Sequence, residues 1–232
     1  MIPLEHGKYY HLYNRGNNRE DLFRTHENYN HFLRLYEKYI YPVADTFAWV
    51  LMKNHFHFLV RIREEEEIGV YLPSNSDGSD DSVRFQTTAR NNLTESEGNN
   101  LTESTGPVRV ISPNIPESAG PFRVNIQKPN PTKHFSHLFN AYAKYYNILY
   151  GRTGSLFQRP FKRIEITDNT HFRNLIIYIH TNPVHHKFCS DYTDYPWSSY
   201  DTIISTKPTK LNRGQTLEWF DDGEHFKELH KQ

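Results

Sequence analysis

The pattern of apolar and polar residues in the first quarter of the chain predicts a strand, a helix and two more strands. Around the first tyrosines, polar and apolar side chains alternate, as they do on a half-buried strand. The next stretch carries apolar residues three and four positions apart, as on an amphipathic helix, and Pro42 closes it. Two further runs rich in β-forming residues are joined tightly at Lys53 and Asn54. The predicted elements are a strand at 8–15, a helix at 26–40, and strands at 43–52 and 55–62.

A long segment, residues 64–132, breaks this periodicity. It begins with four consecutive glutamates, is rich in Ser, Asn, Asp, Gly and Pro, and contains a tandem octapeptide at 91–98 and 99–106. Such a composition buries too little apolar surface to offset the entropy lost on ordering. The sequence therefore predicts a disordered insertion.

Helical periodicity returns after the insertion. An amphipathic helix is predicted over 134–151, ending at a glycine, and an extended segment follows within 156–166. Asp168 is a suitable N-cap for a last helix. We expect that helix to end near Asn182, because Pro183 disfavours helical geometry in the residue before it.

The order of these elements predicts an α+β fold. A βαββ run, an insertion and an αβα run indicate a ferredoxin-like antiparallel sheet with packed helices, followed by an extra helix near the C-terminus. Residues 1–63 and 133–205 then form two parts of one domain, with the insertion at 64–132 between them and a tail or helix at 206–232.

Two histidines share one face of the third predicted strand. Because successive side chains in a strand alternate, His55 and His57 point one way, while Phe56, Phe58 and Val60 point the other way into a core. Two imidazoles held on a sheet are a good start to a metal site. With 14 histidines in 232 residues, however, chance alone gives about one such pair. The pair could equally be a surface or core pair without a metal, so a third ligand and a nucleophile are needed.

The last predicted helix supplies both. Tyr178 and Asn182 are four residues apart and so lie on one face, about one turn from each other. If that face covers the histidines, a metal would meet two imidazoles and an amide oxygen, with a phenol alongside and coordination positions left open. Asn182 and Pro183 could instead serve only to end the helix, and the sequence favours neither this interpretation nor that of Asn182 as a ligand.

The formal net charge of zero averages two unlike regions. Residues 64–133 hold 11 acidic and 6 basic side chains, whereas the rest of the chain holds 21 basic and 16 acidic side chains and all 14 histidines. An aromatic-rich, moderately basic folded part is expected for a surface that meets polyanions. The single cysteine, Cys189, excludes an internal disulfide and cysteine-based zinc sites. No membrane-spanning run or secretory signal is evident, which favours a cytoplasmic protein.

Five stretches of the chain resemble one family. Residues 52–60 (MKNHFHFLV) are similar to the His-hydrophobic-His signature of the HUH superfamily, the single-strand DNA transposases with one catalytic tyrosine. Residues 178–184 (YIHTNPV) resemble the tyrosine motif of the REP-associated branch of that superfamily. Three supporting stretches are YHLYNRGN at 10–17, GSLFQRPF at 154–161 and WSSY at 197–200, and all five stretches occur in the order expected for this family.

The resemblance implies a metal-dependent tyrosine transposase or DNA strand transferase. A Mg²⁺ or Mn²⁺ ion would be held by His55, His57 and Asn182, and Tyr178 would attack a backbone phosphate of single-stranded DNA, giving a 5′-phosphotyrosine and a free 3′-hydroxyl. The sequence does not identify the general base. His180 is close to Tyr178 in sequence but points off its face, so it is not assigned that role. The expected substrate is single-stranded DNA at hairpin-forming repeats, bound by a monomer or a homodimer. The candidate phosphate contacts are Arg15, Arg19, Lys53, Arg159, Lys162 and Arg163.

Several other interpretations stay open. A relaxase-like or replication-initiator-like nickase shares the chemistry and differs in its DNA site. A non-catalytic hairpin-binding or RNA-binding module on the same scaffold predicts aromatic side chains, not histidines, on the open sheet face. An inactive, domesticated relative would keep only hairpin binding. Among single residues, His11 is expected to be a sheet histidine rather than a ligand, and the basic cluster at 159–163 could be an ordinary solvated edge.

Overall fold

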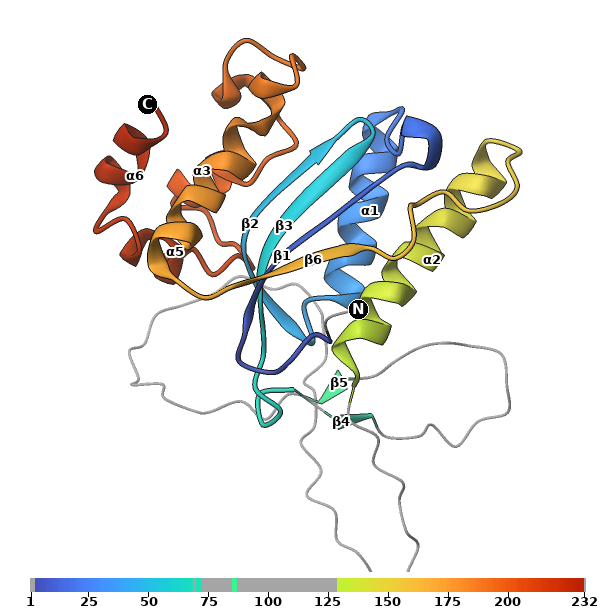
Figure 1. Ribbon diagram of the computed structural model, residues 1–232, viewed down its shortest axis with the longest axis horizontal. Coiled ribbons are helices and arrows are strands. Elements are labelled where there is room, and N and C mark those ends of the chain that lie inside the picture. The colour runs from blue at the N-terminus through green and yellow to red at the C-terminus, as the bar shows by residue number, and fades with distance from the viewer. Residues whose placement is uncertain (1–2, 69, 72–84, 87–128, 232) are drawn as a thin grey trace, which may run out of the picture.

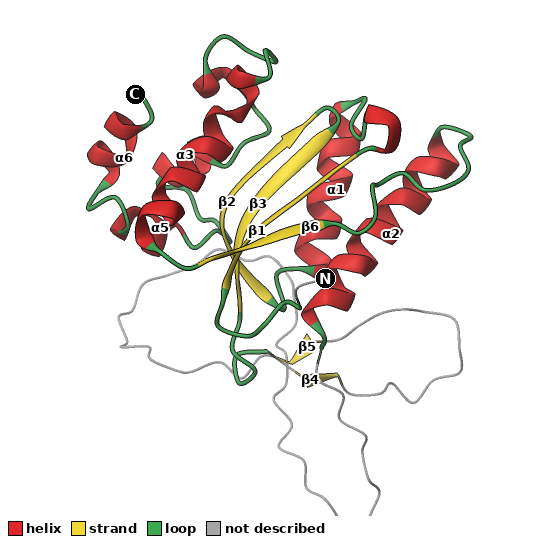
Figure 2. Ribbon diagram, viewed as in Figure 1, coloured by secondary structure: helices red, strands yellow, loops and turns green. Residues whose placement is uncertain are grey.

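A four-stranded antiparallel sheet with helices on both faces forms the centre of the protein (Figures 1 and 2). The computed structural model describes residues 3–68, 70–71, 85–86 and 129–231. The strand order is β2-β3-β1-β6, which is the ferredoxin-like arrangement, so the α+β fold class predicted from the sequence is confirmed. The strands are β1 (Tyr9–Arg15), β2 (Ala44–Met52), β3 (His55–Ile62) and β6 (Lys162–Ile166), with a separate pair, β4 (Val70–Tyr71) and β5 (Phe85–Gln86).

The helices divide between the two faces of this sheet. One face is covered by α1 and α2, and the other by α3 together with the short helices near the C-terminus (Figure 1). The bounds are α1 (His26–Tyr39), α2 (Pro131–Leu149), α3 (Asn169–His185), α4 (Tyr200–Ile204), α5 (Arg213–Glu218) and α6 (Gly223–Leu229), with 3-10 turns η1 (Asn17–Arg19) and η2 (Tyr192–Asp194).

Strand β3 separates two hydrophobic cores. Phe56, Phe58 and Val60 are buried against α1 and α2, as the alternation of the sequence predicts. Leu59 packs on the other side, with Ile176 and Ile179 of α3. The same alternation places the two histidines of β3 on the α3 side, so burying the first core orients the candidate site.

Helix α2 begins and ends at residues suited to those positions. It starts at Pro131, three residues before the predicted start. The Asn130 side chain caps it by accepting a hydrogen bond of 3.0 Å from the backbone N–H of Lys133. Proline suits the first helical position, where the N–H that it lacks would have no partner within the helix. It ends before Gly151, which has a φ of +60° and thus the left-handed geometry that glycine adopts without strain. The predicted glycine stop is confirmed.

Helix α3 does not end near Asn182, so that expectation was wrong. It begins as predicted, with the Asp168 carboxylate accepting from the N–H of His171 at 2.8 Å, but runs on to His185 with Pro183 inside it. Pro183 removes only its own donor. The next turn closes normally, with the N–H of His186 donating to the carbonyl of Asn182 at 3.0 Å. Asn182 therefore lies within the helix, which fixes the direction of its side chain.

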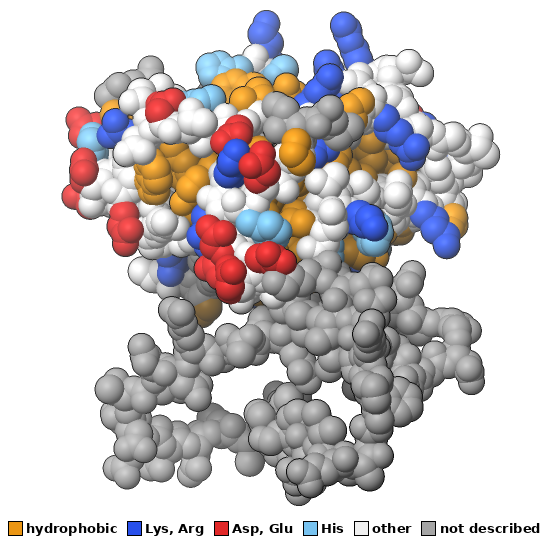
Figure 3. Space-filling view, turned by 60° about the horizontal axis from the view of Figure 1, so that its bottom comes forward, with side chains coloured by type: hydrophobic (Ala, Val, Ile, Leu, Met, Phe, Trp, Pro, Cys, Tyr) orange, Lys and Arg blue, Asp and Glu red, His pale blue; other side chains and the backbone are white. Residues whose placement is uncertain are grey.

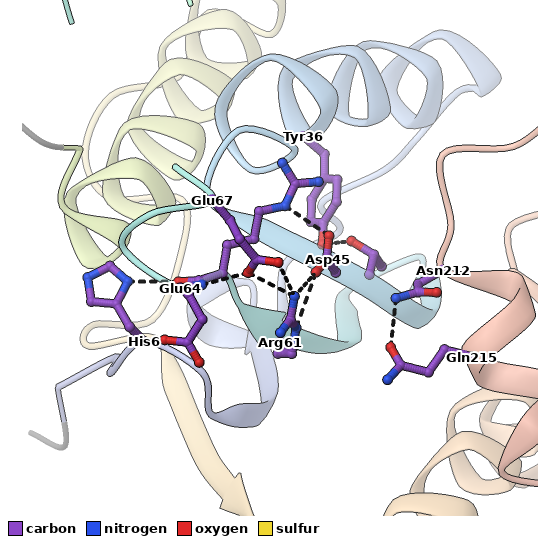
Figure 4. A network of polar contacts seen from close by, with 10 residues as sticks. His6, Tyr36, Asp45, Arg61, Glu64, Glu67, Asn212 and Gln215 are labelled. Carbon is purple, nitrogen blue, oxygen red and sulfur yellow. Dashed lines mark hydrogen bonds and ion pairs between the residues drawn. The ribbon is translucent and has the colours of Figure 1, made fainter. Parts of the chain in front are cut away.

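An ionic network fixes the end of β3 where the predicted insertion begins (Figure 4). Arg61 lies 2.8 Å from Asp45 and 3.0 Å from Glu67, and Arg63 lies 2.9 Å from the same aspartate. Ile68, which directly follows Glu67, is buried. The first residues of the 64–132 segment therefore belong to the folded part, while most of the predicted disordered insertion, including the octapeptide repeat, lies outside the described residues.

Charged side chains are unevenly distributed on the face shown in Figure 3. Aspartates and glutamates gather toward the left and centre of that view, and lysines and arginines stand mainly toward its top and right. The zero net charge of the chain therefore does not describe its local surface. Within the described residues, no helix has both the length and the apolar character that crossing a bilayer requires.

Candidate functional site

The candidate site lies where α3 crosses the histidine face of the sheet. The register of β1 against β3 sets Tyr13 opposite His57 and Arg15 opposite His55, so these four side chains share that face. His55 and His57 retain only 9% and 6% of their possible exposure. The predicted common face of the two histidines is confirmed.

Helix α3 places its tyrosine and asparagine over the two imidazoles. The Tyr178 ring meets the His57 ring edge-on, with 5.5 Å between centroids and an interplanar angle of 86°. Tyr178 is 41% exposed, whereas Asn182, one turn along, is fully buried. A phenol that is reachable from solvent thus lies beside two rigid imidazoles of the same chain.

The hydrogen bond of His55 determines which of its nitrogens faces the cavity. His55 Nδ1 lies 2.6 Å from the side-chain oxygen of Asn54, which only accepts, so Nδ1 carries the proton and donates. The Nε2 atom of the neutral ring then keeps its lone pair. This arrangement is usual for histidines that bind metals, because the partner of one nitrogen orients the other.

Burial keeps both imidazoles uncharged. It lowers the pKa of His55 to about 4, helped by nearby His186 and opposed by the adjacent Asn182 side chain. Burial also lowers the pKa of His57 well below its usual value, with further lowering from neighbouring histidines. At neutral pH neither ring has to lose a proton before it binds a cation.

The Asn182 amide is buried and has no hydrogen-bond partner among the described residues. Both its Oδ1 and its Nδ2 atoms lack a partner with acceptable geometry. The amide lies within hydrogen-bonding reach of His55 and raises the pKa of that ring, but the geometry between them is not that of a well-formed hydrogen bond. A buried amide left in this state costs roughly 1–3 kcal/mol, so it is a feature that a bound ligand would relieve.

His55, His57 and Tyr178 line a cavity of about 300 Å³, whereas Asn182 is buried behind its wall. Its described lining contains two cations, Arg15 and Lys162, and no carboxylate, so it favours an anionic occupant. Sequence reasoning missed several lining residues. His186 could have been found, because 178, 182 and 186 share one helical face, but the helix was expected to end at 182. The full lining is Tyr13, Asn14, Arg15, His55, His57, Gln158, Lys162, Tyr178 and His186.

The donor set fits a divalent cation of intermediate hardness. Within the described residues, no three His, Cys, Asp or Glu side chains converge as a metal cage. The candidate ligands are instead two neutral imidazoles and the orphaned amide of Asn182. Imidazoles suit transition ions better than Mg²⁺, which prefers carboxylates and phosphates. Of the two ions expected from the sequence, this set therefore fits Mn²⁺ better than Mg²⁺, unless a substrate phosphate supplies an anionic oxygen.

A solved structure of a REP-associated tyrosine transposase bound to a REP hairpin is similar to this chain. The two chains are 15% identical, and the similarity covers 90% of this chain and 86% of the other, with a TM-score of 0.48. No family model and no curated protein matches the sequence. The functional interpretation below therefore depends on the motifs and on the geometry of the site.

The six predicted phosphate contacts fall into different settings. Arg15 and Lys162 line the cavity, the latter because β6 pairs it with Tyr13. Lys53 is paired with Asp21 at 3.0 Å, and Arg19 lies exposed in η1. The structure thus brings two of the six directly to the candidate site.

Arg159 and Arg163 line a second, larger hollow of about 740 Å³ between α2 and the segment before β6. Arg159 is exposed, but Arg163 is buried with its guanidinium 4.1 Å from the centre of the Phe161 ring. The two hollows adjoin, because Asn14 and Gln158 line both of them. The basic cluster is therefore not a uniform solvated edge.

His180 points away from the site, as expected from its helical position. It is fully buried, with Nε2 2.8 Å from Ser199 Oγ and Nδ1 2.8 Å from His230 Nε2. These bonds tie α3 to the segment before α4 and to the C-terminal end of the described chain. Since both ring nitrogens are occupied, His180 has no atom left for proton transfer at Tyr178.

Proposed function

We propose that this protein is a metal-dependent strand transferase acting on single-stranded DNA, with Tyr178 as the nucleophile. The observation that supports it most is the half-exposed phenol of Tyr178 beside His57, one helical turn from the orphaned Asn182 amide. A packing tyrosine would be buried and a structural asparagine would be hydrogen-bonded.

The reaction proposed is a phosphoryl transfer to tyrosine. The Tyr178 oxygen forms a bond to phosphorus as the bond from phosphorus to the 3′ oxygen breaks. The phenol gives up one proton and the departing 3′ oxygen takes up one, so the step is balanced. The products are a 5′-phosphotyrosine and a free 3′-hydroxyl. Because the phosphoester is kept, a second 3′-hydroxyl reverses the step onto a new strand without an external energy source.

The chain's own residues supply positioning and charge. Arg15 and Lys162 lie in the cavity where they would hold the phosphate. When bound by His55, His57 and Asn182, Mn²⁺ or Mg²⁺ would neutralise and polarise that phosphate. Tyr178 is fixed by α3, whose apolar face is anchored in the second core, so its phenol is held in place before substrate arrives.

Hairpin-forming DNA repeats are the proposed substrates, on the basis of the REP-associated motif at 178–184. The nickase interpretation uses the same site and differs only in the DNA that it cuts. A sheet-face RNA-binding module has less support, because α3 covers the sheet face that such a module would leave open for bases.

A covalent-adduct assay tests this function. We expect a labelled hairpin oligonucleotide and Mn²⁺ to give a protein–DNA adduct that survives denaturing electrophoresis and is lost in Tyr178→Phe. Tyr41→Phe is the matched control, because Tyr41 is also 41% exposed but lies away from the site, and it should leave the adduct unchanged. An adduct of equal yield in Tyr178→Phe, or in excess chelator, would overturn the proposal.

A further inference from the structure

We propose that His11 is a positioning residue that selects the tautomer of His57 and so leaves His57 Nε2 free to bind a cation. This inference rests on the proposed metal-dependent function and deepens it. It assigns a role to a histidine that sequence reasoning treated as an ordinary sheet residue.

The two rings are bonded to each other inside the sheet. His11 Nε2 lies 2.8 Å from His57 Nδ1, and the rings stack with centroids 5.1 Å apart and 25° between planes. His11 pairs with Leu59 in the register of β1 and β3, so His57 is its diagonal neighbour on the same face. Both side chains are more than nine-tenths buried. This bond is therefore shielded from water and fixed by two neighbouring strands.

A bond between two neutral imidazoles admits only two proton arrangements. Each ring has one N–H and one lone pair, so one ring donates and the other accepts. If His11 donates, His57 carries its own proton on Nε2, and that atom cannot bind a cation. If His57 donates from Nδ1, its Nε2 keeps the lone pair. Only the second arrangement makes His57 a ligand, and it requires His11 Nε2 to be the acceptor.

The pattern at His55 supports this assignment. There the Nδ1 atom donates to the side-chain oxygen of Asn54 at 2.6 Å. His11 Nε2 occupies the equivalent place for His57, so each candidate ligand has an acceptor behind its Nδ1 atom. Such partners orient metal-binding histidines and commonly change metal affinity 10–100-fold when they are removed.

His11 is not itself suited to be a ligand or a base. Its Nε2 atom is occupied by His57, and it does not line the site cavity. Its ring centroid is 6.3 Å from that of Tyr178, with the rings edge-on. We therefore assign His11 a role through His57, not through direct contact with substrate.

Two substitutions separate the acceptor from the packing. His11→Gln keeps an acceptor oxygen near the position of Nε2, whereas His11→Phe keeps a ring and removes the acceptor. Mn²⁺ affinity is measured without DNA by electron paramagnetic resonance. We expect His11→Phe to weaken it 10–100-fold and His11→Gln to stay within about threefold of wild type. Equal affinity in His11→Phe and wild type, or equal losses in both variants, would overturn the proposal.

The tautomer of His57 is also read in the unsubstituted protein. Nitrogen-15 NMR of the metal-free chain should show the proton of His57 on Nδ1 and the lone pair on Nε2. The opposite tautomer would overturn the inference even if the variants failed to fold. Neither measurement requires DNA cleavage, so a failure of the strand-transfer proposal, seen as an unchanged adduct in Tyr178→Phe, is distinguishable from a failure here.

Discussion

Replacing Asn182 with leucine should stabilise the metal-free protein while removing its function. The amide is fully buried, and neither of its polar atoms makes a well-formed hydrogen bond among the described residues, although the side chain lies within reach of His55. An apolar side chain of similar size removes this unsatisfied pair from the interior. Stability and function thus oppose each other at this residue, as expected where a buried polar group is kept for a ligand.

The gain in the free energy of unfolding has two sources, the loss of the buried amide and the helix propensity of leucine. Relieving a buried, unsatisfied amide is worth about 1–3 kcal/mol. Leucine also has a slightly higher helix propensity than asparagine, which adds a few tenths of a kcal/mol within α3. For a folded part of this size, the sum corresponds to an increase in Tm of roughly 3–10 °C in the presence of chelator.

The assay is denaturant unfolding in EDTA, with Asn174→Leu as the matched control. Asn174 lies on the same helix but is exposed, so its substitution reports helix propensity without the buried amide. Added Mn²⁺ should raise the free energy of unfolding of wild type and of Asn174→Leu, but not that of Asn182→Leu.

The reasoning is refuted if Asn182→Leu is no more stable than Asn174→Leu in EDTA. That result would mean that the amide is already satisfied in the folded protein, for example by His55. It would then be a structural asparagine and not an available ligand.

Two further predictions concern charge and pH. For binding of single-stranded DNA, Arg15→Ala and Lys162→Ala should each reduce the slope of log K, the association constant, against log salt concentration by about 0.7. Lys227→Ala on α6 should leave that slope unchanged. Equal slopes in all three variants would exclude phosphate contacts in the cavity. Burial lowers the pKa of His230 to about 4. Below pH 6.5 this histidine therefore binds a proton in the unfolded chain, whereas in the folded chain it stays uncharged until the pH approaches 4. The contribution of His230 to the free energy of unfolding should therefore be complete above pH 6.5, and up to about 3 kcal/mol of it should be lost toward pH 4. His230→Gln should reduce this loss when the free energy of unfolding is compared at pH 7.5 and 4.5. An identical pH dependence in that variant would show that His230 is not buried uncharged.

Local periodicity was sufficient to predict much of the geometry of the candidate site. The alternation at residues 55–60 indicated which side of β3 carries the histidines, and the spacing of Tyr178 and Asn182 indicated their common helical face. Both rules act within one element, where geometry follows from backbone period alone.

The features of the candidate site that the sequence did not predict depend on contacts between elements, or on a balance between small favourable and unfavourable free energies. The bond between His11 and His57 joins residues 46 positions apart and depends on the register of two strands. His186 joined the site because α3 tolerates Pro183, whose missing donor costs less than the packing of that helix gains. Neither outcome follows from propensity.

The most direct test of the account is the position of a bound Mn²⁺ ion in crystals of the protein, located by its anomalous scattering. We predict one ion bonded to Nε2 of His55, Nε2 of His57 and Oδ1 of Asn182, with the Tyr178 phenol beside it. An ion held elsewhere, or bound to these histidines while Asn182 faces away and Tyr178 lies out of reach, would contradict a single site built by β3 and α3.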